Sequence, residues 1–325
     1  MNFRTELLLP VSEPKISLSS RVLTLGSCFA DVLGQQLKNN KLAVLSNPFG
    51  TVFNPLSIFK LLRQSLDNQL PDADLFVQNQ DIWQHYDFHS SLWSNDRNSS
   101  IWQTALQNTG DFLKNTDYLI LTFGTAYGYF LKDQNLKLVA NCHKTPAAQF
   151  TKALLNVPQM MDDFEDTYHL IKAQNPNLRV ILTVSPVRHT RDTLPLNQVS
   201  KSVLRLACHY LQEHFADVPY FPSYELLLDD LRDYRFYKPD LIHPNEVAET
   251  YIFEKFAESF FDDDLKTFVA EWAKIRQSLW HRLQQTGTEN HRLFLENLLK
   301  KLEKFGETTD VTAETRQVKA ELAQF

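Results

Sequence analysis

The sequence predicts a doubly wound α/β fold, in which one parallel sheet lies between two layers of helices. Short runs rich in β-branched and aliphatic residues alternate with longer segments whose apolar residues recur at helical spacing. Because the short runs are almost continuously apolar, they are typical of strands that are covered on both faces. The five expected strands span residues 21–25, 42–45, 117–123, 179–184 and 218–221.

Helical periodicity fills most of the connections between these strands. The expected helices cover residues 29–38, 55–65, 101–113, 157–173, 195–215 and 246–260. One connection is different, because residues 127–131 and 136–140 are two strand-like runs joined by a short polar segment. This pattern predicts a β-hairpin inserted after the third strand.

The C-terminal segment differs in composition from the rest of the chain. No proline follows Pro244, charged residues are frequent, and apolar residues recur at helical spacing from Leu265 to Leu279. A second helix is expected over residues 290–304. We therefore divide the chain into an α/β domain, residues 1–261, and a helical appendage, residues 262–325. The appendage either packs against its own domain or forms the arm of a homodimer.

Size, charge and cysteine content limit the class of protein. A chain of 325 residues that is 43% hydrophobic can bury one large α/β core, and a net charge of −6 indicates no general attraction to nucleic acid or to an anionic membrane surface. No apolar run approaches the roughly 20 residues that cross a bilayer, and the N-terminus does not resemble a secretory signal. Three cysteines without a CxxC pair predict a reducing, cytoplasmic location.

Ser27 is the first candidate for a catalytic residue. It follows Gly26 at the end of the first expected strand and precedes a helical segment. In open α/β sheets, ligands bind beyond the carboxyl ends of the strands, and a helix N-terminus there offers backbone N–H groups to a developing anion. These features predict a serine nucleophile. The alternative is a serine that only caps the helix.

A base for this nucleophile is available after the last expected strand. Asp240 lies three residues before His243, on a turn that leads into the helix at residues 246–260. An aspartate at this spacing can accept a hydrogen bond from Nδ1 of the histidine and leave the other ring nitrogen free for the serine. Taken alone, the pair is equally compatible with a solvated helix start. The order along the chain, Ser27 first and the pair last, favours a catalytic unit.

Cys28 is an alternative nucleophile, since a thiol at the start of a helix has a lowered pKa and a raised reactivity. Neighbouring side chains diverge, so one histidine does not serve Ser27 and Cys28 equally, and Cys28 is otherwise a small buried hydrophobe. Arg188 and His189 follow the fourth expected strand, where Arg188 could bind a carboxylate or phosphate or form an internal ion pair. Cys142, His143 and His189 lack the spaced carboxylate or second thiol of a metal site, and we expect none.

Several segments together resemble the GSCFA family, whose name is spelled by Gly26–Ala30. The resemblance extends over residues 5–260 and includes residues 47–55, 123–126, 141–144, 183–189 and 231–237. The family is placed in the SGNH/GDSL hydrolase superfamily. The resemblance therefore implies an SGNH-hydrolase domain with a flavodoxin-like sheet, and it implies Ser27 as nucleophile, with Cys28 where GDSL has leucine.

The resemblance also implies the groups that hold the oxyanion. Ser27 and Gly50 would each contribute a backbone N–H. The usual Gly-x-Asn block reads Gly124, Thr125 and Ala126 here, so the asparagine donor is missing. Loss of such a donor costs on the order of 10²–10³ in rate. We expect Asn141 to replace it, or else Thr125; Asn141 is otherwise a loop side chain that satisfies the local backbone. Thr125, His143, Arg188 and His189 are the expected substrate-binding residues.

The resulting hypothesis is a serine esterase that removes an acyl group from an alcohol oxygen through Ser27, His243 and Asp240. Neither a metal nor an organic cofactor is expected, and acetyl groups on carbohydrate would suit the superfamily. The same site would also serve an acyltransferase. The missing asparagine at Ala126 leaves a third hypothesis open, a catalytically degenerate binding protein on the same fold. If the chain has a protein partner, we expect a second copy of the chain, which would form a homodimer through the C-terminal helices.

Overall fold

A five-stranded parallel sheet forms the centre of the computed structural model, which describes residues 4–9, 11–280 and 288–325. The strand order is β10-β9-β5-β1-β2. The strands are β1 (Arg21–Gly26), β2 (Ala43–Ser46), β5 (Tyr118–Phe123), β9 (Arg179–Val184) and β10 (Tyr220–Phe221). All five predicted strands are therefore present, and every pairing in this sheet is parallel.

Helices cover both faces of the sheet, so the doubly wound, three-layer prediction is confirmed. They are α1 (Cys28–Asn39), α2 (Pro55–Leu66), α3 (Ile101–Leu113), α4 (Val157–Gln174), α5 (Leu194–His214) and α7 (Glu246–Phe260). Along β1, Val22 packs with α1 and α7, whereas Leu23 faces α2, α3, α4 and α5. This alternation follows from the two-residue period of a strand, and it explains why strands with two buried faces are apolar throughout.

The predicted hairpin is present and belongs to a small antiparallel sheet. Its strands are β6 (Tyr127–Leu131) and β7 (Lys137–Val139), and β8 (Phe150–Leu154) pairs with the other side of β6. A separate hairpin is formed by β3 (Phe76–Asn79) and β4 (Ile82–His85). The sequence did not predict β3, β4 or β8. Four of the five residues of β8 are exposed, so β8 lacks the apolar pattern of a buried strand.

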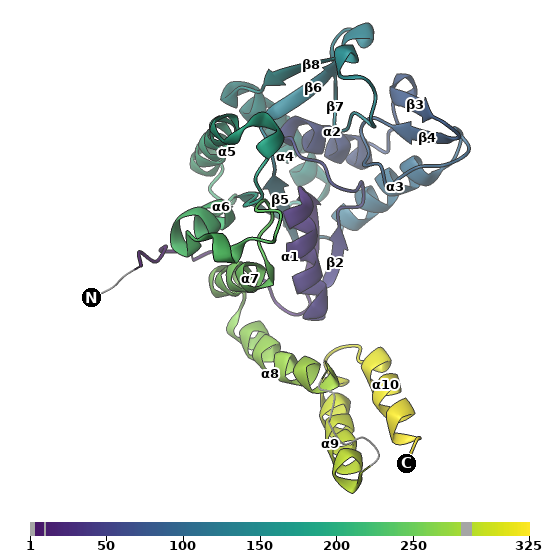
Figure 1. Cartoon of the computed structure of the whole chain (residues 1–325), viewed down its shortest axis with the longest axis vertical. Coiled ribbons are helices and arrows are strands. Elements are labelled where there is room, and N and C mark those ends of the chain that lie inside the picture. The colour runs from purple at the N-terminus through teal and green to yellow at the C-terminus, as the bar shows by residue number, and fades with distance from the viewer. Residues whose placement is uncertain (1–3, 10, 281–287) are drawn as a thin grey trace.

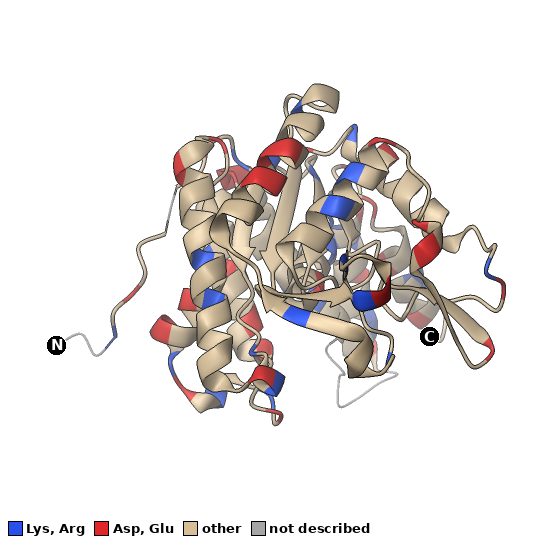
Figure 2. Ribbon diagram, turned by 90° about the horizontal axis from the view of Figure 1, so that it is seen from above, with Lys and Arg blue, Asp and Glu red and all other residues tan. Residues whose placement is uncertain are grey.

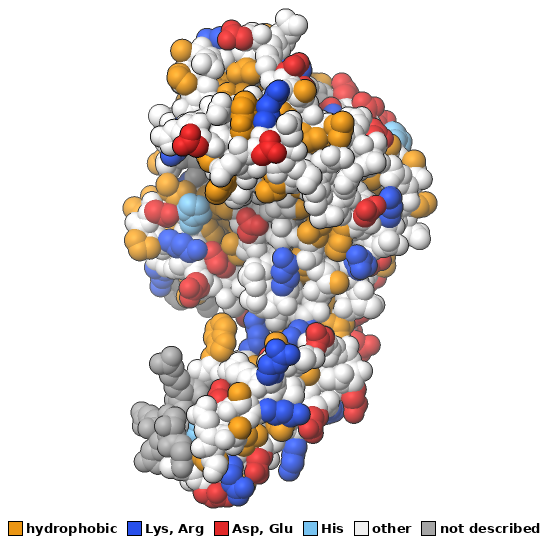
Figure 3. Space-filling model, turned by 90° about the vertical axis from the view of Figure 1, so that its right-hand side faces the viewer, with side chains coloured by type: hydrophobic (Ala, Val, Ile, Leu, Met, Phe, Trp, Pro, Cys, Tyr) orange, Lys and Arg blue, Asp and Glu red, His pale blue; other side chains and the backbone are white. Residues whose placement is uncertain are grey.

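The C-terminal helices form a lobe with a core of its own below the α/β domain (Figures 1 and 3). They are α8 (Asp263–Trp280), α9 (Glu289–Phe305) and α10 (Thr312–Leu322). Trp272 is buried in this core and donates a hydrogen bond from Nε1 to the carbonyl of Asn39 at 2.9 Å. Lys41 and Glu314 form a second link, an ion pair of 2.7 Å. The lobe thus contacts its own α/β domain. The domain boundary near residue 262 and the homodimer through the C-terminal helices remain predictions.

Acidic and basic residues are interspersed along the ribbon in the view from above and do not gather into a region of one sign (Figure 2). This distribution fits the modest net charge of −6. Among the helices that the structure describes, none has both the length and the apolar character that a membrane span requires.

Candidate active site

A cavity of about 480 Å³ lies at the carboxyl edge of the central sheet. Its lining comes from chain segments that follow different strands: Cys28 after β1, Thr125 and Tyr127 after β5, and residues 187–192 after β9. His243, just before α7, completes the wall. Because parallel strands end at one edge, the fold brings these distant segments together where ligands bind in open α/β sheets.

His243 and Asp240 form a hydrogen-bonded pair at this cavity. Nδ1 of His243 lies 2.7 Å from Oδ2 of Asp240. The backbone N–H groups of Ile242 and His243 donate to Oδ1 of the same carboxylate at 2.9 and 3.0 Å. These N–H bonds, together with the imidazole, lower the pKa of Asp240 to about 2. A carboxylate that stays ionised orients the ring and leaves Nε2 as the nitrogen available to a nucleophile.

Ser27 does not face the cavity, which corrects the expectation from the sequence. Its side chain is fully buried, and Oγ accepts a hydrogen bond from the N–H of Phe29 at 3.3 Å, so Ser27 is the N-cap of α1. Its own N–H donates to the carbonyl of Thr122 at 3.0 Å and is not free to bind an oxyanion. The capping alternative therefore describes Ser27.

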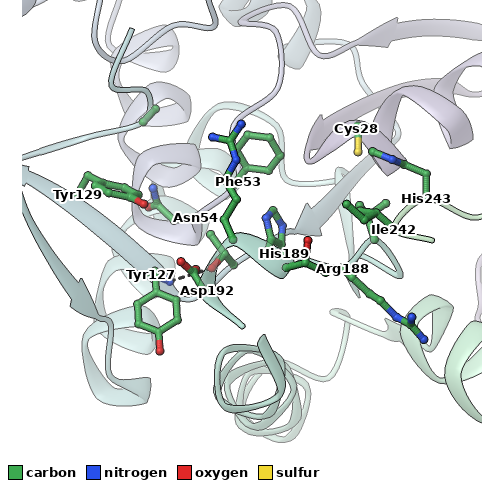
Figure 4. A pocket seen from close by; sticks show the side chains of 15 residues that line it. Cys28, Phe53, Asn54, Tyr127, Tyr129, Arg188, His189, Asp192, Ile242 and His243 are labelled. Atoms are coloured by element: carbon green, nitrogen blue, oxygen red, sulfur yellow. Dashed lines mark hydrogen bonds between the residues drawn. The ribbon is translucent and has the colours of Figure 1, made fainter. Parts of the chain in front are cut away.

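Cys28 lines the cavity instead, together with His243. Figure 4 shows its sulfur beside the His243 ring, with His189 and Phe53 further along the same cavity. Burial is the main cause that raises the pKa of the thiol, and Asp31 adds to it. Lys201 and the backbone N–H groups of Cys28 and Phe29 act in the opposite direction. Because its pKa is raised, the Cys28 thiol is protonated at neutral pH.

Two of the expected oxyanion donors are committed elsewhere. The N–H of Gly50 donates to the carbonyl of Asn47 at 2.7 Å, and a Cβ built on Gly50 would lie 2.3 Å from Cβ of His89. Gly50 thus closes a turn that faces His89. Nδ2 of Asn141 donates to the carbonyl of Phe88 at 3.0 Å, the local-backbone role that was its alternative. Neither residue lines the cavity.

The N–H of Cys28 is a donor that the sequence reasoning did not consider. As the first residue of α1 it has no acceptor within its own helix. The Thr125 hydroxyl lies in the cavity wall but is bonded, at 3.0 Å from Oγ of Ser200 and 3.1 Å from the N–H of Tyr127. The helix N-terminus at Cys28 is therefore the available donor next to the thiol.

The expected substrate-binding residues Arg188, His189 and His143 lie in different surroundings. His189 and Arg188 line the cavity, but the Arg188 guanidinium lies 4.1 Å from the centre of the Tyr237 ring and points away in Figure 4. His143 is buried outside the cavity, where Nε2 lies 2.8 Å from the carbonyl of His85. Contacts with neighbouring residues of the same chain thus hold the side chains of Arg188 and His143 in place.

His189 lines the cavity, unlike His143, and is therefore the expected histidine that a ligand would contact. Burial, followed by the Lys201 ammonium, lowers the pKa of His189 to about 4, so its imidazole is neutral. Its buried Nε2 has no hydrogen-bond partner within the described residues. The same part of the chain contains no cluster of three His, Cys, Asp or Glu side chains that would hold a metal ion.

Comparison with solved structures found weak similarities. A Streptococcus pneumonia protein provisionally described as a platelet activating factor is 10% identical, with a TM-score of 0.40 over 74% of this chain and 83% of its own. A carbohydrate esterase family 3 protein from Talaromyces cellulolyticus is 10% identical, with a TM-score of 0.35 over 79% of this chain and 99% of its own. A carbohydrate esterase family 2 enzyme from Corynascus thermopiles (Myceliophthora fergusii) is 15% identical, with a TM-score of 0.29 over 48% and 38%.

Comparison with curated protein sequences found no match. Two family models do match the chain. The model of the GSCFA domain protein C-terminal domain matches residues 272–324, the helical lobe. The GSCFA family model matches residues 21–256, which contain the whole parallel sheet and the cavity. Since this second match spans more than half of the 325 residues, the chain belongs to the GSCFA family.

Proposed function

We propose that the chain is an esterase-type hydrolase in which the thiol of Cys28, rather than the hydroxyl of Ser27, is the nucleophile. The observation that carries the proposal is that Cys28 and His243 line one cavity, while His243 is hydrogen-bonded to Asp240. A nucleophile, a base and a group that orients the base are the parts that covalent acyl transfer requires.

In the first half of the reaction, the Cys28 sulfur attacks the carbonyl carbon of the ester and His243 Nε2 takes the thiol proton. The N–H of Cys28, at the positive end of α1, donates to the oxyanion that forms. The bond between the carbonyl carbon and the alcohol oxygen then breaks. The alcohol leaves with the proton from His243, and the acyl group stays on Cys28 as a thioester.

In the second half, His243 removes a proton from water, and the hydroxide attacks the thioester. The carbon–sulfur bond breaks, the acid leaves, and the sulfur recovers the proton from His243. Asp240 remains ionised throughout and stabilises the imidazolium that forms in each half. An alcohol in place of water would make the same site an acyltransferase.

A shifted comparison with the superfamily motif supports this choice of nucleophile. If the four letters of GDSL are placed on residues 26–29, the serine of the motif coincides with Cys28 and its aspartate with Ser27. The site would then be of the SGNH/GDSL type, with a thiol in place of the hydroxyl. A small acyl group such as acetyl on a carbohydrate suits the cavity, because Phe53, Tyr127 and Tyr129 offer aromatic surface on which a sugar ring can lie.

The test uses p-nitrophenyl acetate and two single variants. Cys28→Ala should lose on the order of 10⁴ or more in kcat, as does removal of the nucleophile from a catalytic triad. Ser27→Ala should remain active and lose only the cap of α1, about 1 kcal/mol of stability. Mass spectrometry of the quenched reaction should find an acetyl group on Cys28 that hydroxylamine removes.

An inactive Ser27→Ala together with an active Cys28→Ala, or an acetyl group on Ser27, would show that Ser27 is the nucleophile. A chain that binds acyl esters without turning them over, and that carries no adduct, would be a binding protein on this fold.

A further inference from the structure

A small second hollow adjoins the candidate cavity at the segment that follows β9. Its volume is about 120 Å³, and its lining comes from that segment, from α5 and from residues 224–237. Arg188 lines both the hollow and the cavity, so the two share a wall. Figure 4 shows the Arg188 side chain pointing away from Cys28 and His243. Its guanidinium group therefore belongs to the hollow rather than to the cavity.

Two tyrosine rings hold this guanidinium group in place without neutralising it. Its central carbon lies 4.1 Å from the centre of the Tyr237 ring and 5.3 Å from that of Tyr234, and both rings line the hollow. One N–H group donates to the carbonyl of Leu241 at a long 3.4 Å. Arg188 takes part in no ion pair with the residues that the structure describes. An arginine stacked in this way keeps the N–H groups at its edge for a ligand.

Two amide side chains of α5 add donors to the same hollow. Asn197 is 3% exposed, and its Oδ1 accepts the N–H of His189 at 2.9 Å, which fixes the orientation of the amide. Its Nδ2 has no acceptor within the part of the chain that the structure describes. Oε1 of Gln198 likewise accepts the hydroxyl of Tyr224 and leaves Nε2 as a donor. A buried amide N–H that lacks an acceptor is costly, unless a ligand supplies one.

The lining of the hollow is suited to an anion. Arg188 is the one charged residue among the described residues that line it, and the free amide groups are donors. A carboxylate carries negative charge and only accepts hydrogen bonds, so its two oxygens match the fork of an arginine. A neighbouring hollow of about 310 Å³ also includes Arg188, but Asp229 and Asp233 line it and would repel an anion.

We propose that the smaller hollow is a carboxylate-binding site, in which Arg188 and Asn197 hold the acid group of an anionic sugar such as a uronate. If the ester of that sugar lies in the candidate cavity, the shared wall at Arg188 makes the alcohol part of the substrate acidic. The sugar's role as substrate rests on the proposed function. Binding of the carboxylate does not, because it involves neither Cys28 nor His243.

The experiment titrates the unaltered chain with glucuronate and with glucose, two sugars that differ in a carboxylate in place of a CH₂OH group. Calorimetry should give a Kd for glucuronate about tenfold below that for glucose, the effect of a charge-assisted hydrogen-bond pair that is partly exposed. In Arg188→Gln the two constants should become equal. Equal constants in the unaltered chain, or a preference that survives Arg188→Gln, overturn the proposal.

Arg191→Gln is the matched control. Arg191 is exposed and lines the cavity but not the hollow, so the variant removes an equal charge next to the site. Its preference for glucuronate should stay about tenfold, as in the unaltered chain. A preference that is lost in Arg191→Gln would place the carboxylate in the cavity and would overturn the proposal as well.

A second variant covers the case in which Arg188→Gln does not fold. Gln198 is exposed on α5, and Gln198→Glu keeps an oxygen for the Tyr224 hydroxyl while it places a negative charge at the hollow. Repulsion should then abolish the preference for glucuronate at low salt. An unchanged Kd for glucuronate in this variant overturns the proposal.

The carboxylate site and the esterase fail in different ways. If O-acetyl esters of glucuronate and glucose are not hydrolysed but Arg188 governs the binding of glucuronate, the esterase proposal falls and the site stands. If Cys28 carries the acyl group but glucuronate binds no better than glucose, the reverse holds.

Discussion

A single position along the chain separates the residue that caps α1 from the residue that faces the cavity. Ser27 and Cys28 are neighbours, yet Ser27 is fully buried and Cys28 lines the wall beside His243. Successive residues of a helix point about 100° apart, so only one of the two side chains can face His243. A serine that precedes a helix is a common cap, and its hydroxyl is then already bonded.

The Asp240–His243 pair yields a prediction at the residue scale. Asp240→Asn should leave the His243 ring in place but favour the wrong tautomer, as the equivalent change does in a serine-protease triad, where it lowers kcat about 10⁴-fold. Esterase assays of this variant beside Asp233→Asn, an exposed aspartate before the same loop, measure the effect. Near-parental turnover in Asp240→Asn would remove Asp240 from the mechanism.

The pKa of Asp240 also determines how the stability difference between the parent and Asp240→Asn depends on pH. Its pKa falls from the ordinary 3.8 to about 2 in the folded chain, so folding favours the carboxylate. The stabilisation is complete above the ordinary value and is lost as the pH falls through the folded value. The difference in melting temperature between the parent and Asp240→Asn should therefore be constant above about pH 5 and shrink towards pH 2.

At the scale of elements, the turn between β1 and α1 is what directs Cys28 into the cavity. Gly26 ends β1 with a φ of 137°, in a region that L side chains rarely adopt. A Cβ at this position would lie 2.1 Å from the carbonyl oxygen of Thr122 on β5. The turn is therefore possible only because β1 approaches β5 without a side chain at its last residue.

Gly26→Ala tests this turn. Backbone strain and a contact with a carbonyl that cannot move should lower the free energy of unfolding by roughly 3 kcal/mol, and the Cys28 thiol should lose its alignment with His243. Gly306→Ala is the matched control, because Gly306 has an ordinary φ of −61° and its nearest contact is 3.2 Å. Denaturant unfolding of both variants gives the comparison. Equal stabilities would mean that the strand accommodates a Cβ here.

At the scale of the whole molecule, the helical lobe contacts the α/β domain through α8: Leu265 packs in the core cluster of α1 and α7, and Trp272 lies at the end of α1. The Trp272 ring is buried, Nε1 bonds to Asn39, and Lys41 lies 4.9 Å from the centre of the ring. The candidate active-site cavity is lined by α/β residues alone. Stability and catalysis should therefore respond differently to changes in the lobe.

Trp272→Ala should destabilise the chain by about 3–5 kcal/mol, the usual result of truncating a buried aromatic side chain. Trp280→Ala is the control, since Trp280 is 83% exposed on the same helix. Thermal melting and ester hydrolysis of both proteins are the measurements. Loss of kcat in folded Trp272→Ala would indicate that the lobe takes part in the reaction, against the separation inferred here.

Sequence alone determined the strands of the parallel sheet, the helices that cover it and the Asp240–His243 spacing, but not β3, β4 or β8. Tertiary structure decided which side chains meet. Helices such as residues 101–113 and 246–260 were predicted at their observed bounds, because periodicity and capping act between near neighbours. The directions of Ser27, Gly50 and Asn141 depend instead on Thr122, His89 and Phe88, which lie far away in sequence. The same holds for Lys201, whose polarity is explained only by carbonyls at the ends of β5 and β9. No local pattern records contacts of this kind, since they exist only after the sheet has formed.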